Sequence, residues 1–187
     1  MGRCWRTLSA LLLLVLAWRV SGAVNYRTAL SMSMDLAIQD RQFECMSEQG
    51  YSVLLLPAYV KNMGGQSTTS VNDNILNAQE RGGFDIQITA EFSCNSFLEK
   101  TARGQVAQML QNLDQFAEHY KPSIVWIIVI RGGDWTDDIG KNNIFIIQVV
   151  LALRMLNPTG KIGIYTTAED WHNITGNLRG LGADVRL

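Results

Sequence analysis

Carboxylates at the predicted ends of strands are the residues of this chain most able to do chemistry. Asp35, Glu91 and Asp134 each stand near the carboxyl end of an apolar run. Two carboxyl groups that face one cleft can act as a general acid and as a base or nucleophile. The sequence therefore allows an acid–base site, with Asp35 and Glu91 as the pair to consider. The alternative is that these acids only accept hydrogen bonds from loop amides.

Metal and cofactor chemistry have no comparable set of residues. His119 and His172 are isolated, and no Cys or His spacing matches a metal site. No glycine fingerprint follows the first predicted strand, where Asp35 to Ile38 leads straight into a helix, so a dinucleotide fold is not indicated. We expect neither a metal nor a cofactor.

Short apolar runs alternate with helical periods along the chain, which is the pattern of an α/β fold with a parallel sheet covered by helices. Gly50 and Pro122 end two of the predicted helices. The options are a (β/α) barrel or an open doubly wound sheet. The strands are predicted at 29–37, 52–59, 85–92, 124–130, 161–166 and 183–187, and the helices at 40–49, 71–81, 104–120, 142–155 and 169–178.

Several segments resemble glycoside hydrolase family 25 lysozymes, in particular their invertebrate lysozyme-like branch. Met34-Asp35-Leu36 resembles the first-strand Asp motif of that family, and the run from Phe43 to Tyr51 resembles its Phe-x-Cys helix and Gly-Tyr strand entry. Asn74 to Ala78 resembles Asn-Ile-x-Asn-Ala, and Gly163 to Thr166 with Trp171 resembles Gly-Ile-Tyr-Thr…Trp. The resemblance implies a TIM-like (β/α) barrel, here incomplete, as one domain over residues 24–187.

The acid pair of the family is missing from its expected place. In the family the fourth strand reads Trp, apolar, Asp, apolar, Glu, and a short loop ending in an aromatic follows. With the two tryptophans of this segment as anchors, the acids fall on Ile128 and Ile130, and a register one residue later gives Val129 and Arg131. Isoleucine has no proton to give and no charge to stabilise a positive sugar centre, although in a strand it also serves as core filler.

The resemblance implies a lysozyme that cleaves the glycan strand of peptidoglycan. The lost pair instead predicts a catalytically inactive protein that binds peptidoglycan or a chitin-like glycan in innate defence. Asp35 is then the surviving family acid, and Glu91 is its candidate replacement partner. The alternatives are an active muramidase with displaced carboxylates (Asp35, Glu91 or Asp134), and a structural or protein-interaction role without glycan binding.

Aromatic residues supply the candidate sugar contacts. Tyr59, Trp135 and Tyr165 could offer stacking faces to a sugar or serve as core or rim aromatics, whereas Trp171 is expected in the core. Arg131 could hold an anionic glycan group, but we favour a salt bridge to a loop carboxylate such as Asp134.

The first 23 residues predict a secretory signal peptide. Arg3 and Arg6 precede a short apolar run, and Ser21 and Ala23 stand at the −3 and −1 positions of a cleavage site. The mature chain is then secreted or lysosomal, and no later stretch predicts a stable membrane span. It keeps 13 basic against 17 acidic residues, a net charge of −4, so charge alone would not draw it to nucleic acid or to an anionic envelope.

Cysteine usage and one sequon are consistent with that compartment. Cys45 and Cys94 remain after the signal is removed, and they form one disulfide or stay as two buried thiols. Asn173-Ile174-Thr175 is an N-glycosylation sequon. The family normally continues beyond the equivalent of residue 187, so the barrel is expected to have an open edge that self-association, a partner or a swapped segment would cover.

Overall fold

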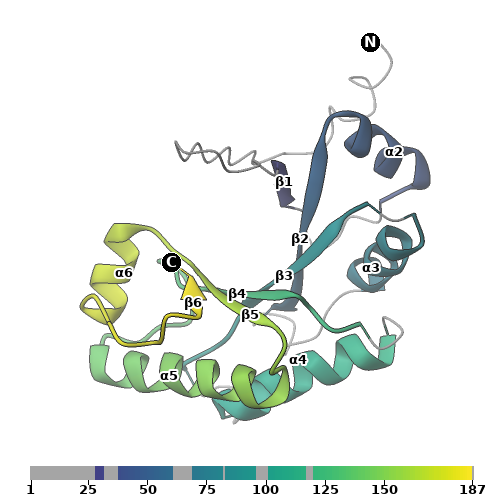
Figure 1. The fold of residues 1–187 in the computed structure, drawn as a ribbon. Helices are drawn as coiled ribbons and strands as arrows, with labels where there is room; N and C mark the ends of the chain where they lie inside the picture. Colours follow the sequence, from purple (N-terminus) through teal and green to yellow (C-terminus); the bar gives the residue numbers. More distant parts are fainter. Residues whose placement is uncertain are drawn as a thin grey trace.

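One sheet of six parallel strands runs through the molecule, and its strands lie in chain order (Figure 1). The computed structural model describes residues 28–31, 38–60, 69–81, 83–95, 101–116 and 120–186. Chain order is that of a (β/α) barrel, whereas a doubly wound sheet reverses it part-way. The predicted parallel α/β fold is confirmed, and the open sheet is compatible with an incomplete barrel. The strands are β1 (Thr28–Ser31), β2 (Tyr51–Val60), β3 (Asp85–Glu91), β4 (Ile124–Ile128), β5 (Lys161–Tyr165) and β6 (Val185–Arg186).

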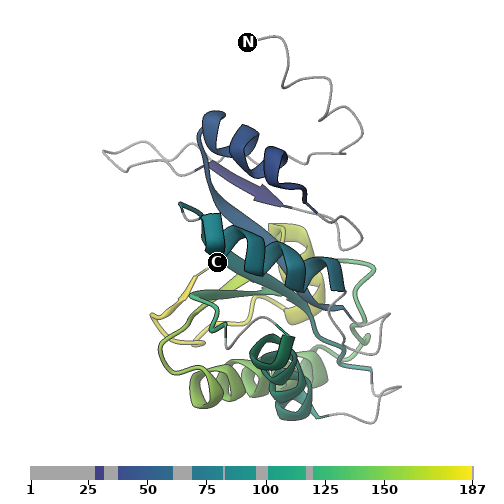
Figure 2. The same cartoon turned by 90° about the vertical axis from the view of Figure 1, so that its right-hand side faces the viewer.

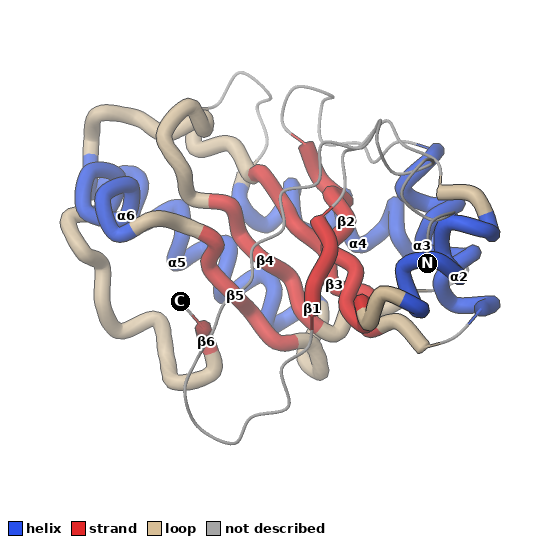
Figure 3. The backbone as a smooth tube through the Cα atoms, turned by 90° about the horizontal axis from the view of Figure 1, so that it is seen from above, coloured by secondary structure: helices blue, strands red, loops and turns tan. Residues whose placement is uncertain are grey.

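A helix follows each of the first five strands, and helices α2 to α5 lie along the outer side of the curved sheet (Figures 1 and 2). Seen from above, the strands lie side by side with helices behind them (Figure 3). The core fills the space between these two layers, with fully buried side chains from strands and helices alike. The helices are α2 (Asp40–Glu48), α3 (Thr69–Arg81), α4 (Ala102–Phe116), α5 (Ile139–Leu156) and α6 (Ala168–Thr175).

Side chains of β4 alternate between two differently packed faces. Val125 and Ile127 are buried in the core, while Trp126 and Ile128 are only partly buried on the inner face of the sheet. The indole of Trp126 lies over Gly163 of the neighbouring strand, where an added Cβ would collide with the ring. The inner face of the sheet therefore carries the side chains that are free to meet a ligand.

The observed elements differ from the predicted ones chiefly at their ends. β1 covers only the start of the strand predicted at 29–37, of which residues 32–37 lie outside the described residues. Helix α5 begins at Ile139 rather than at Asn142, because the carboxylate of Asp138 accepts a 3.0 Å hydrogen bond from the backbone N–H of Lys141. The spacing of apolar residues, on which the prediction rested, carries no information about such a cap.

Helix α5 is the one described helix that is long and apolar enough to cross a membrane by length and composition. Lys141 and Arg154 stand near its two ends. One side of the helix is buried within the domain, through Phe145, Ile146, Val149 and other residues. In this structure α5 is therefore a packed helix of the domain.

Two buried tyrosines differ in whether the hydroxyl group has a partner. The hydroxyl of Tyr120 donates a 2.5 Å hydrogen bond to the carbonyl of Ile86. The hydroxyl of Tyr59, whose side chain is 0% exposed, has no partner within the described part of the chain. Burial raises the pKa of Tyr59 to about 12, and burial together with Asp85 raises the pKa of Tyr120 as well.

We predict that Tyr59→Phe leaves the free energy of unfolding unchanged or raises it by about 1 kcal/mol, because it removes an unsatisfied buried hydroxyl. Tyr120→Phe is the matched control and should lower that free energy by about 1–2 kcal/mol, since it removes a buried hydrogen bond to the carbonyl of Ile86. Urea unfolding followed by tryptophan fluorescence measures both variants. Equal losses of stability in the two variants would contradict the conclusion that the hydroxyl of Tyr120 is hydrogen-bonded and that of Tyr59 is not.

The raised pKa values also predict that stability falls at alkaline pH. Tyrosine in the unfolded chain ionises near pH 10, whereas folded Tyr59 stays neutral until its pKa of about 12. The unfolded state therefore loses its proton first, so stability is complete below about pH 10 and decreases as the pH rises towards 12. The urea midpoint should fall less steeply with rising pH in Tyr59→Phe than in the wild-type protein. The same dependence on pH in both would show that Tyr59 does not contribute to the loss of stability.

Candidate functional site

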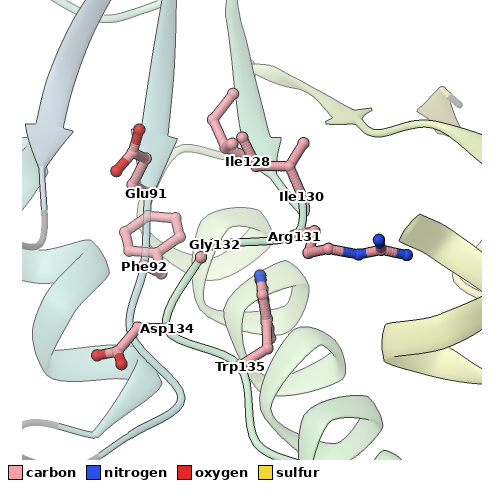
Figure 4. A pocket seen from close by; sticks show the side chains of 9 residues that line it. Glu91, Phe92, Ile128, Ile130, Arg131, Gly132, Asp134 and Trp135 are labelled. Atoms are coloured by element: carbon pink, nitrogen blue, oxygen red, sulfur yellow. The ribbon is translucent and has the colours of Figure 1, made fainter.

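A pocket opens at the carboxyl ends of β3 and β4, the end at which barrel folds carry their active sites (Figure 4). Its volume is about 400 Å³ including the open mouth. The ends of the two strands form one side, and the loop after β4 forms the other. The lining residues are Glu91, Phe92, Ile128, Ile130, Arg131, Gly132, Gly133, Asp134 and Trp135.

Ile128 and Ile130 both line this pocket, and Val129 between them does not. The side chain of Val129 is fully buried in the core, and its N–H donates a 2.9 Å hydrogen bond to the carbonyl of Tyr165. With the register anchored on the two tryptophans, both positions at which the resemblance predicts the family's acids line the pocket, whereas in the later register Val129 does not. Two branched alkyl groups, neither able to donate a proton, occupy those positions.

Two carboxylates border the pocket. Glu91 is the last residue of β3 and lies near Ile128, and none of the described residues forms a hydrogen bond to its carboxylate (Figure 4). The carboxylate of Asp134 accepts a hydrogen bond from the hydroxyl of Ser93 in the loop after β3. Asp35 lies outside the described residues, so a pair formed by Asp35 and Glu91 stays a prediction.

A tight turn sends the side chain of Arg131 away from the pocket (Figure 4). Gly132 follows it with φ +83°, a conformation that favours glycine and that position i+2 of a type II turn requires. The guanidinium forms a 2.5 Å salt bridge with Glu169 and lies 4.0 Å from Asp170, both on α6. The predicted salt bridge is therefore present, but its partner is Glu169 rather than Asp134, whose carboxylate faces the loop after β3.

Two buried amide side chains hold the loops on either side of the pocket, and the sequence analysis did not identify them. Gln105 on α4 accepts from the N–H of Ser93 at 2.9 Å and donates to its carbonyl at 2.8 Å. Asn142 on α5 accepts from the N–H of Thr136 at 3.0 Å and donates to its carbonyl at 2.8 Å. A polar residue on the buried side of a predicted helix is the signal that could have revealed both, because buried polar groups need partners.

Two of the three aromatic candidates lie at or near the pocket. Trp135 lines it, and its indole packs edge-to-face on Phe145 with ring centroids 6.2 Å apart. Tyr165 is 41% exposed and pairs in register with Ile128, so it lies on the same inner face of the sheet. Trp171 is buried, as expected.

Tyr59, the third candidate, is wrong as a stacking residue. Its ring is buried against Phe92, with centroids 5.1 Å apart, and has no face open to a ligand. The cause is a shift of register in β2 after Pro57, which pairs Tyr59 with Ala90 rather than with an inner-face residue. Without that irregularity, alternation from Pro57 would have placed Tyr59 on the inner face.

The predicted disulfide between Cys45 and Cys94 is not formed, because Cys94 carries a free, buried thiol. Cys94 lies beside the pocket loop: its N–H donates to the carbonyl of Asp134 at 3.1 Å, and its sulfur is 3.9 Å from the carbonyl of Lys141. Cys45 lies on α2, which packs against β2 and α3. Burial raises the pKa of the Cys94 thiol, with Lys141 acting in the opposite direction, so the group is not set up as a nucleophile.

The chain order of the strands and the pocket at their carboxyl ends define an α/β domain of the barrel type. The chain belongs to the family described as Lysozyme-like protein 1, which it matches over residues 24–187. This membership confirms the resemblance to family 25 lysozymes.

Individual relatives agree with that assignment. The chain is 29% identical to Lysozyme-like protein 7 of Caenorhabditis elegans over 168 residues, which is 89% of the chain and 56% of the relative. It is 26% identical to Probable GH family 25 lysozyme 4 of Dictyostelium discoideum, over 90% of the chain and 74% of the relative. It is 25% identical to Lysozyme-like protein 1 of C. elegans, over 90% and 53%. The chain thus spans between about half and three quarters of the length of these relatives.

We predict that the stability of the domain depends on the side chain of Asp134 more than on that of Arg131. Asp134→Ala should lower the free energy of unfolding by about 1–2 kcal/mol, because it removes a charge-assisted hydrogen bond between two loops. Arg131→Ala, the control, should cost at most about 0.5 kcal/mol, since both partners of its ion pair are largely exposed. Urea unfolding measures both, and the reverse ranking would contradict this account.

Proposed function

We propose that this chain is a catalytically inactive lysozyme-like protein that binds peptidoglycan or a related glycan. The observation that carries the proposal is that Ile128 and Ile130, the positions at which the resemblance predicts the acids of the family, line the pocket. Glycoside hydrolysis needs a proton donor for the leaving oxygen and a second group to stabilise the oxocarbenium-like state. General acid catalysis alone supplies about 10²–10⁴-fold in rate, so the loss of both groups leaves little hydrolysis.

Glycan binding in this proposal rests on shape and apolar contact rather than on charge. The alkyl groups of Ile128 and Ile130, the indole of Trp135 and the exposed ring of Tyr165 suit the apolar face of a pyranose. Glu91 stands at the edge of the same pocket and can accept hydrogen bonds from sugar hydroxyls. The net charge of −4 predicted for the mature chain gives no attraction to an anionic envelope.

Secretion, or delivery to the lysosomal lumen, and a role in innate defence are part of the same proposal. The signal peptide predicted at residues 1–23 supports it. Asn173 is exposed on α6, so a glycan at the sequon would not disturb the core. The neighbouring Thr175 is buried, with its hydroxyl bonded to the carbonyl of Trp171 at 2.5 Å, so glycosylation would have to precede folding.

The proposal is tested on a suspension of Gram-positive peptidoglycan, with turbidity and pellet retention measured on the same sample. We expect no clearing above a heat-denatured control, together with retention of the protein in the pellet. Clearing by the wild-type protein would overturn the inactive assignment. If the protein neither clears the suspension nor stays in the pellet, glycan binding would be overturned, and a structural or protein-interaction role would remain.

Pocket variants connect retention to this site. Tyr165→Ala and Ile128→Asp should each lower pellet retention several-fold, because they remove apolar contact with the sugar face. Glu48→Ala, exposed on α2 away from the pocket, is the control and should be retained like the wild-type protein. Retention that survives both pocket variants would place the glycan elsewhere on the molecule.

An active muramidase with displaced carboxylates is the second candidate, and one observation favours it. Glu91 and Asp134 both border the pocket, so two carboxyl groups remain near the site of the lost pair. The hydrogen bond from Ser93 to Asp134 argues against it, since it directs that carboxylate to the neighbouring loop. Clearing that Glu91→Gln abolishes would establish this candidate in place of the first.

A further inference from the structure

The pocket at the carboxyl ends of β3 and β4 carries negative charge that no described cation neutralises. Among the residues that line it, Glu91 and Asp134 are acidic and Arg131 is basic. The guanidinium of Arg131 points away from the pocket and is paired with Glu169 on α6 (Figure 4). Within the described ranges of the chain, the pocket is therefore an apolar cavity with acidic groups at its edge.

The two carboxylates are not equally available to a ligand. The carboxylate of Asp134 accepts a hydrogen bond from Ser93, which directs it to the loop after β3. Glu91 is half-buried at the last position of β3, and none of the described residues forms a hydrogen bond to its carboxylate. A carboxylate that loses part of its hydration without gaining a partner favours a ligand that brings a cation or an N–H donor. Glu91 is thus the group that selects the charge of the ligand.

An apolar surface lies directly beside this carboxylate. Ile128 stands next to Glu91 in the pocket, and Ile130 follows two residues further along the chain (Figure 4). The volume of about 400 Å³, open mouth included, is near the lower end of the range for ligand pockets, so it suits a single sugar unit. A ligand that fits both features has a ring with an apolar face and a positive group on its edge.

We infer that the pocket binds a glucosaminyl unit whose 2-amino group is free and protonated, as in chitosan or in peptidoglycan that has lost N-acetyl groups. The inference rests on the glycan binding proposed above and names the sugar that this site prefers. The apolar face of the ring lies against Ile128 and Ile130, and the ammonium group donates to the carboxylate of Glu91.

The charge of Glu91 ranks the sugars that the pocket can meet. An ammonium group adds ionic attraction to its hydrogen bond, whereas the amide of an N-acetylated sugar gives the hydrogen bond alone. The free carboxylate of muramic acid is repelled by the same group. For an ion pair near the protein surface, the amine should gain about two- to fivefold in affinity over the amide.

Titration with two soluble oligosaccharides tests the inference. One is a tetramer of N-acetylglucosamine and the other is the same tetramer without acetyl groups, whose amines are protonated at about pH 5.5. Tryptophan fluorescence, to which Trp135 in the pocket contributes, reports binding. The wild-type protein should bind the free-amine tetramer about two- to fivefold more tightly. Glu91→Gln should lose this preference and keep its affinity for the N-acetylated tetramer, because glutamine keeps an acceptor oxygen and removes only the charge.

Glu48→Gln is the matched control, because it removes the same charge from an exposed site on α2, away from the pocket. It should keep the preference of the wild-type protein, which excludes the net charge of the chain as the cause. The inference would be overturned by equal affinity of the wild-type protein for the two tetramers. It would also be overturned by a preference that survives Glu91→Gln or disappears equally in Glu48→Gln. Binding to neither tetramer would overturn it as well, while retention on peptidoglycan would still uphold the proposed function.

Discussion

The alternation of side chains along β4 and the two residues after it is the constraint that decides which side chains line the pocket. Successive residues of a strand face opposite sides, and on this strand one side is the core between sheet and helices. Val129 must therefore stay apolar, because it is fully buried there. Ile128 and Ile130 face the other way, into the pocket. A slip of one residue would exchange the two sets, which the pairing of Val129 with Tyr165 prevents.

The loops around the pocket are held by the packing of the helices behind them. Gln105 and Asn142 are both buried, and each satisfies its amide on the backbone of a pocket loop. A buried amide without partners is costly, so these hydrogen bonds satisfy the two side chains and also fix the conformation of the loops. The conformation of the pocket loops thus follows from the packing of the fold. In the function proposed above, this pocket serves as a binding surface without hydrolysis.

Much of the fold follows from local patterns in the sequence, whereas the details of the site depend on tertiary contacts. Alternating apolar runs and helical periods predicted the parallel sheet, and two tryptophans located Ile128 and Ile130. Tyr59 was misplaced, because an irregularity in β2 turned it into the core. Pro57 is the local signal of that irregularity, since proline within a strand is typical of bulges, but it does not show which way the following residues turn.

Pairings between elements far apart in the chain were equally beyond the sequence. Arg131 forms its salt bridge with Glu169 rather than with Asp134, because the fold places α6 beside the turn after β4. The free thiol of Cys94 has the same kind of origin, since counting cysteines shows how many can pair and not which elements the fold brings together. The spacing of apolar residues likewise does not predict helix caps such as Asp138, which sets the start of α5.

We propose that this chain has an apolar binding pocket where the family has a hydrolytic one. The most direct test is to measure new reducing ends, and the soluble fragments that carry them, after purified peptidoglycan is incubated with the protein. The account predicts no reducing ends above those of a denatured control, while the protein stays bound to the glycan. Fragments that accumulate with time, and that disappear with Glu91→Gln, would contradict it and show that a displaced carboxylate performs the hydrolysis.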